Sequence, residues 1–551
     1  MSLKKFAPPW TITLALLLSG CGGDDSVNTA VTPPGGAFSN SNLNGTYVVS
    51  LSGYDRTDGY DTYFAVVGTL TANGAGSFTT GLLDIEDPAL GSALQSAYVM
   101  NHLATSGTYN ITADGRGNGT MTVPINGKQV SFGLDFVLSS SSHGLVSRFD
   151  GNGTGSGTID LQAANVTQSD LQGSYAFGLG GVDSTVLNSL NTVGSFTLDA
   201  NGNITAGIQD FANNGDATNL QALAVQGSVL VGTPAAAQMR TNAAGLTSLE
   251  FDAWIIDPTH IKFIETDGLA FLEGDAFVST GQTAFPSGPL VFTLTGEDVY
   301  QGPFSAGGLL SSDGVSRITG GLEDINDEGY VSEAPSIQGS FTYSGARTVL
   351  TLNGLYNGDM VNNINSSGSY TFAAYPYNGG VMLLEIDNGA GTTPGIAGGN
   401  LYVQSATGLS SSGGYGLSLT GVNDLGEVDE VDLIAQVTTS GYDASGLYDV
   451  NNFGWWLTDA ELGGSGYWSV ESNGRGDLQF PYLQTWGGSQ IGSLDLTFYT
   501  VDESTAVFIE TDPYQTATGL FLLQGATGSG VPQRSRFVPT TATSSAHAAL
   551  R

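Results

Sequence analysis

The chain of 551 residues has one cysteine, four histidines and few basic residues. Because Cys21 is the only cysteine, no intrachain disulfide can form and a thiol-based active site has no support. Lys and Arg number 14 against 51 Asp and Glu, giving a net charge of −37. Such a surface repels nucleic acid, so we expect no nucleic-acid partner. The scattered histidines, with no Gly-x-Ser-x-Gly elbow and no phosphate-cradling loop, argue against an enzyme.

The N-terminus has the features of a leader that directs export. Two lysines precede an apolar run at residues 10–18, which is too short for a membrane span and is typical of a secretory signal. The following Leu-Ser-Gly-Cys resembles a bacterial lipobox. The resemblance implies cleavage before Cys21 and acylation of that residue by diacylglycerol and a fatty acid such as palmitate. An ordinary signal peptide with an incidental cysteine is the alternative. Gly22 stands where an inner-membrane retention signal has Asp, which favours the outer membrane.

Glycine is abundant, at 80 residues, and it marks an internal repeat. The segment Phe-Ile-Glu-Thr-Asp occurs at 263–267 and again at 508–512, with a relative, Leu-Leu-Glu-Ile-Asp, at 383–387. A similar opening strand ends in a glycine in each of four units, and these glycines lie 128, 115 and 125 residues apart, at Gly53, Gly181, Gly296 and Gly421. A period of this length predicts four whole domains rather than a solenoid.

Apolar residues alternate with polar ones inside each unit, which indicates strands with one buried face. Tight hairpins are predicted at Asn73-Gly74, Asn201-Gly202, Asp313-Gly314 and Asn473-Gly474. The chain is therefore predicted to be all-β, with four tandem antiparallel barrels of about eight strands, similar in outline to lipocalin or avidin folds. Four β-sandwiches are the alternative, and a barrel that spans the outer membrane is disfavoured.

The composition of the joins predicts the domain boundaries. The predicted segments are a signal peptide at 1–20, a flexible tether at 21–41, β repeats at 42–163, 164–281, 282–405 and 406–531, and a disordered tail at 532–551. Because the joins are short, we expect the four domains to form a semi-rigid string.

Repeat four holds most of the tryptophans, which predicts a ligand site. Aromatic faces beside polar groups bind sugars or small apolar ligands, and the mouth of a barrel is a usual place for such a site. The candidate binding residues are Trp455, Trp456, Trp468, Trp486, Glu510 and Arg475. A tryptophan-rich core without a ligand is the alternative.

Acidic residues recur after the second hairpin of each unit, near Asp84, Asp210, Asp324 and Asp449. Asp324, Asn326 and Glu328 have the spacing of the first oxygen ligands in a Ca²⁺ loop, but Pro335 stands where that loop has its last glutamate. A Ca²⁺ site at these three residues and ordinary solvated acids are both open, and no other cofactor is expected.

Alternation also places the glutamate of the repeated Phe-Ile-Glu-Thr-Asp strand towards the interior, where a carboxylate needs a partner. The units offer arginines at Arg116, Arg240, Arg347 and Arg475. We therefore expect ion pairs within a unit, between Arg347 and Glu385 and between Arg475 and Glu510. A ligand-binding carboxylate is the alternative.

Three segments, Leu-Gln-Gly-Ser-Tyr-Ala-Phe at 171–177, the hairpin at 194–210 and Asp-Gly-Arg-Gly at 114–117, resemble repeats in a group of uncharacterised bacterial surface lipoproteins. The resemblance implies an anchored β-rich protein of the cell envelope and no catalytic residues. The predicted function is a structural or adhesive surface spacer of stacked acidic barrels, attached to the membrane by its lipid. The alternative is a module that binds a glycan or small apolar ligand in repeat four.

Overall fold

A computed structural model of the chain describes most of the residues between 37 and 525. The described ranges are 37–57, 62–184, 189–213, 218–232, 235–240, 249–279, 284–297, 302–334, 336–356, 367–387, 396–410, 412–423, 429–462, 466–481, 483–484, 490–491, 493–513 and 515–525. The predicted signal peptide, Cys21, most of the tether and the predicted tail lie outside these ranges. Within them, no helix has the length and apolar character needed to cross a membrane.

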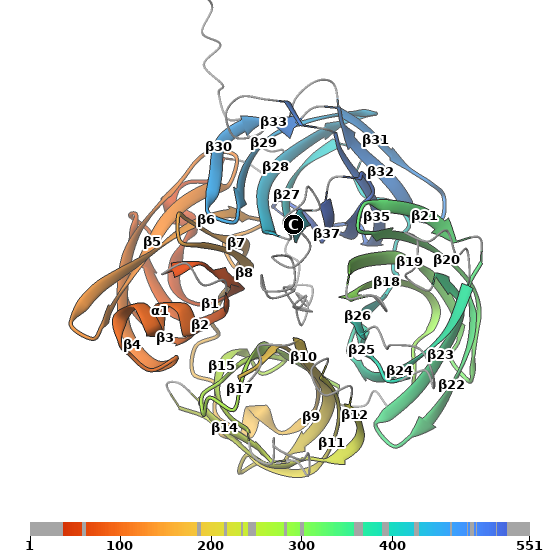
Figure 1. The fold of residues 1–551 in the computed structure, drawn as a ribbon, viewed down its shortest axis with the longest axis horizontal. Helices are drawn as coiled ribbons and strands as arrows, with labels where there is room; N and C mark the ends of the chain where they lie inside the picture. Colours follow the sequence, from red (N-terminus) through yellow and green to blue (C-terminus); the bar gives the residue numbers. More distant parts are fainter. Residues whose placement is uncertain are drawn as a thin grey trace, which may run out of the picture.

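The first two units each form a β-barrel (Figure 1). Barrel 1 contains β1 (Asn44–Asp55), β2 (Thr62–Asn73), β3 (Ser77–Glu86), β4 (Val99–Ile111), β5 (Arg116–Ile125), β6 (Lys128–Leu138), β7 (His143–Asp150) and β8 (Gly153–Leu161). Barrel 2 contains β9 (Gly173–Asp183), β10 (Ser189–Leu198), β11 (Asn203–Asn213), β12 (Thr218–Ala224), β13 (Gln226–Leu230), β14 (Ala235–Arg240), β15 (Leu249–Asp257), β16 (His260–Glu265) and β17 (Ala270–Val278).

The third and fourth units repeat this plan. Barrel 3 contains β18 (Ser287–Glu297), β19 (Pro303–Asp313), β20 (Arg317–Asp327), β21 (Tyr330–Ala334), β22 (Gln338–Ser344), β23 (Arg347–Tyr356), β24 (Ser367–Tyr377), β25 (Gly380–Glu385) and β26 (Ile396–Val403). Barrel 4 contains β27 (Ser412–Asn423), β28 (Asp429–Ser440), β29 (Asp443–Asn452), β30 (Trp455–Glu461), β31 (Gly466–Val470), β32 (Arg475–Phe480), β35 (Leu494–Asp502), β36 (Thr505–Glu510) and β37 (Gln515–Leu523). The short pair β33 (Leu483–Gln484) and β34 (Gln490–Ile491), the helix α1 (Pro88–Leu94) and 3-10 turns at Asn40–Asn42 and Gln168–Leu171 complete the described elements.

Every unit closes on itself through eight antiparallel strands, which confirms the predicted fold class. In barrel 1 the first strand, β1, pairs with both β2 and the last strand, β8. In the other three barrels the ring is completed by the pairings β10–β11, β19–β20 and β28–β29. A ninth strand, β12, β21 or β30, pairs with the third strand of its barrel outside that ring. Closure satisfies the backbone groups that an open sheet would expose at its edges.

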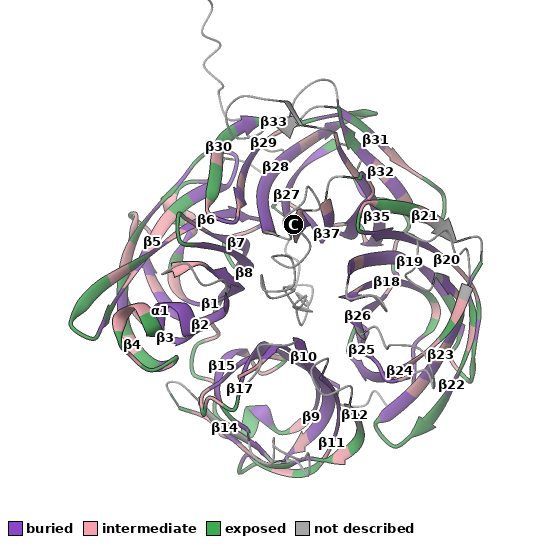
Figure 2. Cartoon of the chain, in the orientation of Figure 1, coloured by how far each residue is buried: buried purple, intermediate pink, exposed green. Residues whose placement is uncertain are grey.

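Each barrel has a core of apolar side chains, and the strands are largely buried (Figure 2). In β1, for example, Val49 and Leu51 lie in the core of barrel 1, and in β27 Leu417 and Leu419 lie in the core of barrel 4. The predicted hairpin glycines adopt positive φ values, 71° at Gly74, 84° at Gly202, 69° at Gly314 and 96° at Gly474. Glycine is favoured there because a side chain strains this backbone conformation.

The four barrels close into a ring (Figure 1). Apolar side chains on the outer faces of neighbouring barrels pack together, such as Tyr63 with Trp254 between barrels 1 and 2 and Ala176 with Tyr375 between barrels 2 and 3. A third cluster joins barrel 4 to both barrels 3 and 1. The expected string of domains is therefore wrong, because these outer faces are apolar and each is buried against a neighbour.

One aspartate on the third strand of each barrel anchors the next barrel. Asp210 receives two hydrogen bonds from Arg347, at 2.8 and 2.7 Å, and Asp324 receives two from Arg475, at 2.8 and 3.0 Å. Asp449 of barrel 4 receives a hydrogen bond of 2.9 Å from Arg116, which joins the two ends of the ring. The recurring acids predicted from the sequence thus serve the junctions between barrels.

These contacts correct the expected ion pairs. Arg347 and Arg475 point out of their own barrels and bind the aspartate of the preceding barrel, so the pairs expected with Glu385 and Glu510 are wrong. Alternation along one strand shows which face a side chain occupies, but it does not show which chain segment covers that face. The side chain of Arg240 lies outside the described residues.

Candidate functional site

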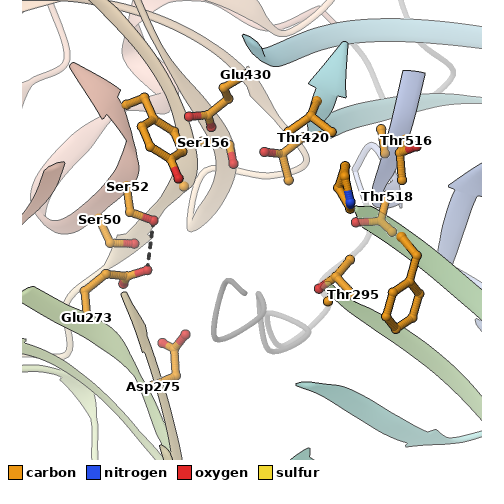
Figure 3. A pocket seen from close by; sticks show the side chains of 18 of the residues that line it. Ser50, Ser52, Ser156, Glu273, Asp275, Thr295, Thr420, Glu430, Thr516 and Thr518 are labelled. Atoms are coloured by element: carbon orange, nitrogen blue, oxygen red, sulfur yellow. Dashed lines mark hydrogen bonds between the residues drawn. The ribbon is translucent and has the colours of Figure 1, made fainter. Parts of the chain in front are cut away.

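A pocket opens where strands of all four barrels meet (Figure 3). Its empty volume is about 820 Å³, including the solvent in its mouth. Seven serine and threonine hydroxyls line it, from Ser50, Ser52, Ser156, Thr295, Thr420, Thr516 and Thr518. Four ionisable groups join them, from Lys262, Glu273, Asp275 and Glu430. We call this cavity the central pocket.

The strand pattern explains why hydroxyls gather in the central pocket. Residues next to Val49 and Leu51 on β1 face away from the barrel core, and they are Ser50 and Ser52. The same alternation turns Thr420 of β27 outward, because Leu419 faces the core. The first strand of barrels 1, 3 and 4 therefore supplies apolar groups to its own core and hydroxyls to the pocket.

Barrel 2 supplies a charged wall to the central pocket. The Lys262 ammonium donates to Asp275 Oδ1 at 2.8 Å, and His260 Nε2 lies 2.7 Å from the same oxygen. Burial alone would raise the pKa of Asp275, but Lys262 and His260 outweigh it and the pKa is lowered. Burial would lower the pKa of Lys262, but the neighbouring carboxylates Asp275, Asp160 and Glu273 raise it. Both groups are therefore charged at neutral pH.

Hydroxyl and carboxylate groups of different barrels meet directly in the pocket. Ser52 Oγ of barrel 1 donates to Glu273 Oε1 of barrel 2 at 3.0 Å (Figure 3). Glu430 of barrel 4 is 2% exposed and also lines the cavity. Three acids and one lysine give the lining a formal charge of −2 (1 − 3). The central pocket can therefore hydrogen-bond a neutral or cationic polar ligand, and it disfavours an anion.

Apolar groups occupy the remaining wall. Tyr54 of barrel 1 and Phe304 of barrel 3 both line the central pocket, as do Pro303, Val422 and Ala517. A cavity with a few convergent polar groups and aromatic surfaces is the usual form of a small-molecule site.

The tryptophans predicted to form a site in repeat four do not share one pocket. Trp468 is buried in the core of barrel 4, stacked on Phe498 with ring centroids 4.6 Å apart. Trp455 and Trp456 lie on the outer strand β30 and are 56% and 49% exposed. Trp486 lies outside the described residues. Trp468 therefore packs the core, which is the alternative that the sequence left open.

Glu510 and Arg475 both lie at the junction between barrels 3 and 4. Glu510 is buried at the end of β36, and its backbone carbonyl accepts a hydrogen bond of 3.0 Å from the Asn326 side chain of barrel 3. Arg475 binds Asp324 at the same junction. These residues hold barrels 3 and 4 together and do not line the central pocket.

Two of the three residues proposed as Ca²⁺ ligands, Asp324 and Asn326, lie at this junction as well. Asp324 uses both carboxylate oxygens for Arg475, and the Asn326 amide donates to the carbonyls of Asp512 and Gln515 at 3.1 and 2.8 Å. Glu328 has a positive φ of 48° in the turn that follows β20. The Asp324 carboxylate and the Asn326 amide thus bind groups of barrel 4.

The sequence did carry one signal for the central pocket that the reasoning from single repeats missed. Ser52, Thr295 and Thr420 each stand directly before the closing glycine of a repeat. A hydroxyl kept at one position of three repeats, on the face opposite the core, indicates a shared polar surface. Lys262 has no equivalent polar residue in the other repeats, and only the packing of the barrels into a ring brings it to the central pocket.

The fold and the pocket define a class of protein: a ring of four eight-stranded barrels around a polar cavity.

No family model matches the sequence, and no curated protein matches it. Among solved structures, transferrin binding protein B of serogroup B Neisseria meningitidis is 9% identical over 69% of this chain and 84% of that one, with a TM-score of 0.18. A transferrin binding protein B variant from Haemophilus parasuis is also 9% identical, over 69% and 82%, with a TM-score of 0.18. Likeness at this level supports no inference about function.

Proposed function

We propose that the chain is a lipid-anchored protein of the bacterial cell envelope that binds a small carbohydrate in the central pocket. The observation that carries this proposal is the lining of hydroxyl and carboxylate groups contributed by four separate barrels. The lipobox around Cys21 and the polar tether support the anchor and the envelope location.

The chemistry of the lining suits a sugar. Each sugar hydroxyl both donates and accepts hydrogen bonds. Serine and threonine hydroxyls can be the acceptor or the donor for it, whereas ionised carboxylates only accept. Tyr54 and Phe304 add aromatic surface on which the apolar face of a sugar ring can pack. The site thus combines donors, acceptors and an apolar face.

A binding experiment on the full-length protein in detergent tests the proposal. A glycan array would first identify a carbohydrate, and calorimetry would then measure its affinity for the wild type, Thr420→Val and Glu430→Gln. We expect each pocket variant to weaken binding by about tenfold, since each loses roughly one hydrogen bond to a polar or charged group. The matched controls, Thr342→Val and Glu461→Gln, change exposed residues on the outside of barrels 3 and 4 and should bind as the wild type does.

Two outcomes would overturn the proposal. One is the absence of saturable binding to any glycan on the array by a folded protein. The other is binding that Thr420→Val and Glu430→Gln leave unchanged, because the ligand would then lie outside the central pocket.

A structural or adhesive role at the surface is a second candidate, supported by the two exposed tryptophans of β30. Large exposed aromatic groups mark contact surfaces, and Trp455 and Trp456 are adjacent and about half exposed. We favour adhesion over spacing, because barrels that return on themselves form a compact ring instead of an extended spacer. Cells that display Trp455→Ala/Trp456→Ala should adhere less to a glycan-coated surface than cells that display the wild type. Tyr442→Ala, which removes a 74% exposed aromatic group elsewhere in barrel 4, is the control and should adhere normally. Equal adherence of cells that display the wild type, the double tryptophan variant and Tyr442→Ala would contradict the adhesive role.

A further inference from the structure

The junction between barrels 1 and 2 differs from the other three. Asp84 of β3 occupies the place of Asp210, Asp324 and Asp449, but its partner across the junction is the neutral Trp254 indole, whose Nε1 donates to Asp84 Oδ2 at 2.9 Å. Among the residues that the structure describes, no lysine or arginine forms an ion pair with Asp84, whereas each of the other three aspartates binds a guanidinium.

Two further potential ligands surround Asp84. His102 of β4 donates its backbone N–H to Asp84 Oδ1 at 2.7 Å, and its ring Nε2 lies 2.5 Å from Asp252 Oδ2 of β15. One ligand atom from each of Asp84, His102 and Asp252 lies within 4.8 Å of the other two. The three residues come from two different barrels, and ring formation brings them together.

The junction between barrels 4 and 1 shows what normally lies in such a position. There the backbone N–H of Asp459 donates to Asp449 Oδ1 at 2.6 Å, so Asp459 is the counterpart of His102. Both carboxylates bind the Arg116 guanidinium, at 2.9 and 2.7 Å. At the junction between barrels 4 and 1, the Arg116 guanidinium therefore lies between Asp449 and Asp459. At the junction between barrels 1 and 2, the equivalent positions hold the Asp84 carboxylate and the His102 imidazole, and Asp252 adds a third group.

We propose that Asp84, His102 and Asp252 bind a divalent transition-metal ion of the Zn²⁺ type at the junction between barrels 1 and 2. Zinc binds imidazole nitrogens and carboxylate oxygens, and where the protein supplies three ligands solvent can supply the fourth. The proposal is independent of the carbohydrate site, which involves none of these residues.

Coordination of a metal ion requires the ligand atoms to move from their present positions. Ligand atoms bound tetrahedrally at about 2.1 Å from zinc lie roughly 3.4 Å apart, so His102 Nε2 and Asp252 Oδ2 must separate from their present 2.5 Å. The His102 side chain is 52% exposed and can move, while Asp252 is 11% exposed and is held in place. Asp84 is oriented by Trp254 and by the His102 backbone, and each of its oxygens keeps a second lone pair for a metal.

Calorimetry of the full-length protein in detergent, after treatment with EDTA, tests this site with ZnCl₂ alone. We expect one saturable site, which His102→Ala and Asp252→Asn each weaken about tenfold or more. Alanine fits the backbone at position 102, because the equivalent Ala222 has a φ of 55° against 56° for His102. The control Glu461→Gln removes an exposed carboxylate elsewhere and should leave the zinc affinity unchanged.

A protein with 51 acidic residues also attracts cations loosely, so the test must separate the two effects. Loose binding would be equal for Ca²⁺ and Zn²⁺ and insensitive to His102→Ala, and that result would overturn the proposal. A crystal soaked in ZnCl₂ gives an independent readout: anomalous scattering beside His102 Nε2 supports the site, and its absence there refutes it even if a variant fails to fold.

Discussion

Arg116 closes the ring, and its replacement by alanine should open the junction between barrels 4 and 1. The Arg116 side chain is 5% exposed and binds three carboxylates: Asp114 at 3.1 Å, Asp449 at 2.9 Å and Asp459 at 2.7 Å. Asp459 is 76% exposed, so that pair contributes about 1 kcal/mol at most. Asp114 and Asp449 are 1% and 9% exposed, and Arg116→Ala would leave both charges buried. We therefore expect a loss of about 3–5 kcal/mol at this junction.

Urea unfolding followed by fluorescence, together with small-angle X-ray scattering, measures this effect. Because four units need not unfold in one step, the midpoint of the earliest transition is the quantity to compare. We expect a lower midpoint and a larger radius of gyration, as the ring opens into an arc. The control Arg317→Ala removes an exposed arginine and should change stability by about 0.5 kcal/mol or less.

A double variant tests the reasoning behind that magnitude. Since Asp449→Asn removes one of the stranded charges, Arg116→Ala/Asp449→Asn should lose less stability than the sum of the single variants. Strict additivity, or a single Arg116→Ala variant as stable as Arg317→Ala, would refute the account of ring closure.

The remaining predictions concern a buried acid and the tryptophans of barrel 4. Burial and the neighbouring Asp267 raise the pKa of Glu265 to about 9 from an ordinary 4.5, so the folded protein holds a proton that the unfolded chain releases. The stability that this proton contributes is present below pH 4.5 and is lost as the pH rises towards 9. Urea midpoints should therefore fall between these pH values, and they should fall less in Glu265→Gln. An identical pH profile for the variant and the wild type would contradict the prediction. Trp468→Ala should lower the free energy of unfolding by about 3–5 kcal/mol, because it leaves a cavity in the core of barrel 4. Trp455 is 56% exposed, so Trp455→Ala should lower it by about 0.5 kcal/mol or less. Equal urea midpoints for the two variants would show that Trp468 does not support the core.

Much of the fold followed from local patterns. The closing glycines and the Phe-Ile-Glu-Thr-Asp strand revealed four units, and alternation with Asn-Gly or Asp-Gly turns indicated antiparallel strands that close into barrels. These features are local, because a turn needs a residue that tolerates positive φ and a strand needs one apolar face. The sequence by itself therefore determined what each barrel is, and it marked Ser52, Thr295 and Thr420 as residues on the face opposite the core.

Only the tertiary structure decided what covers the outer faces of the barrels. Arg116 meets Asp449 across 333 residues of chain, and Ser52 meets Glu273 across 221. No periodicity in the sequence reports such distances, since alternation assigns a residue to a face but leaves the partner of that face open. The ring, the identity of its buried ion pairs, the central pocket and the cluster of Asp84, His102 and Asp252 all arise from this packing of one barrel against the next.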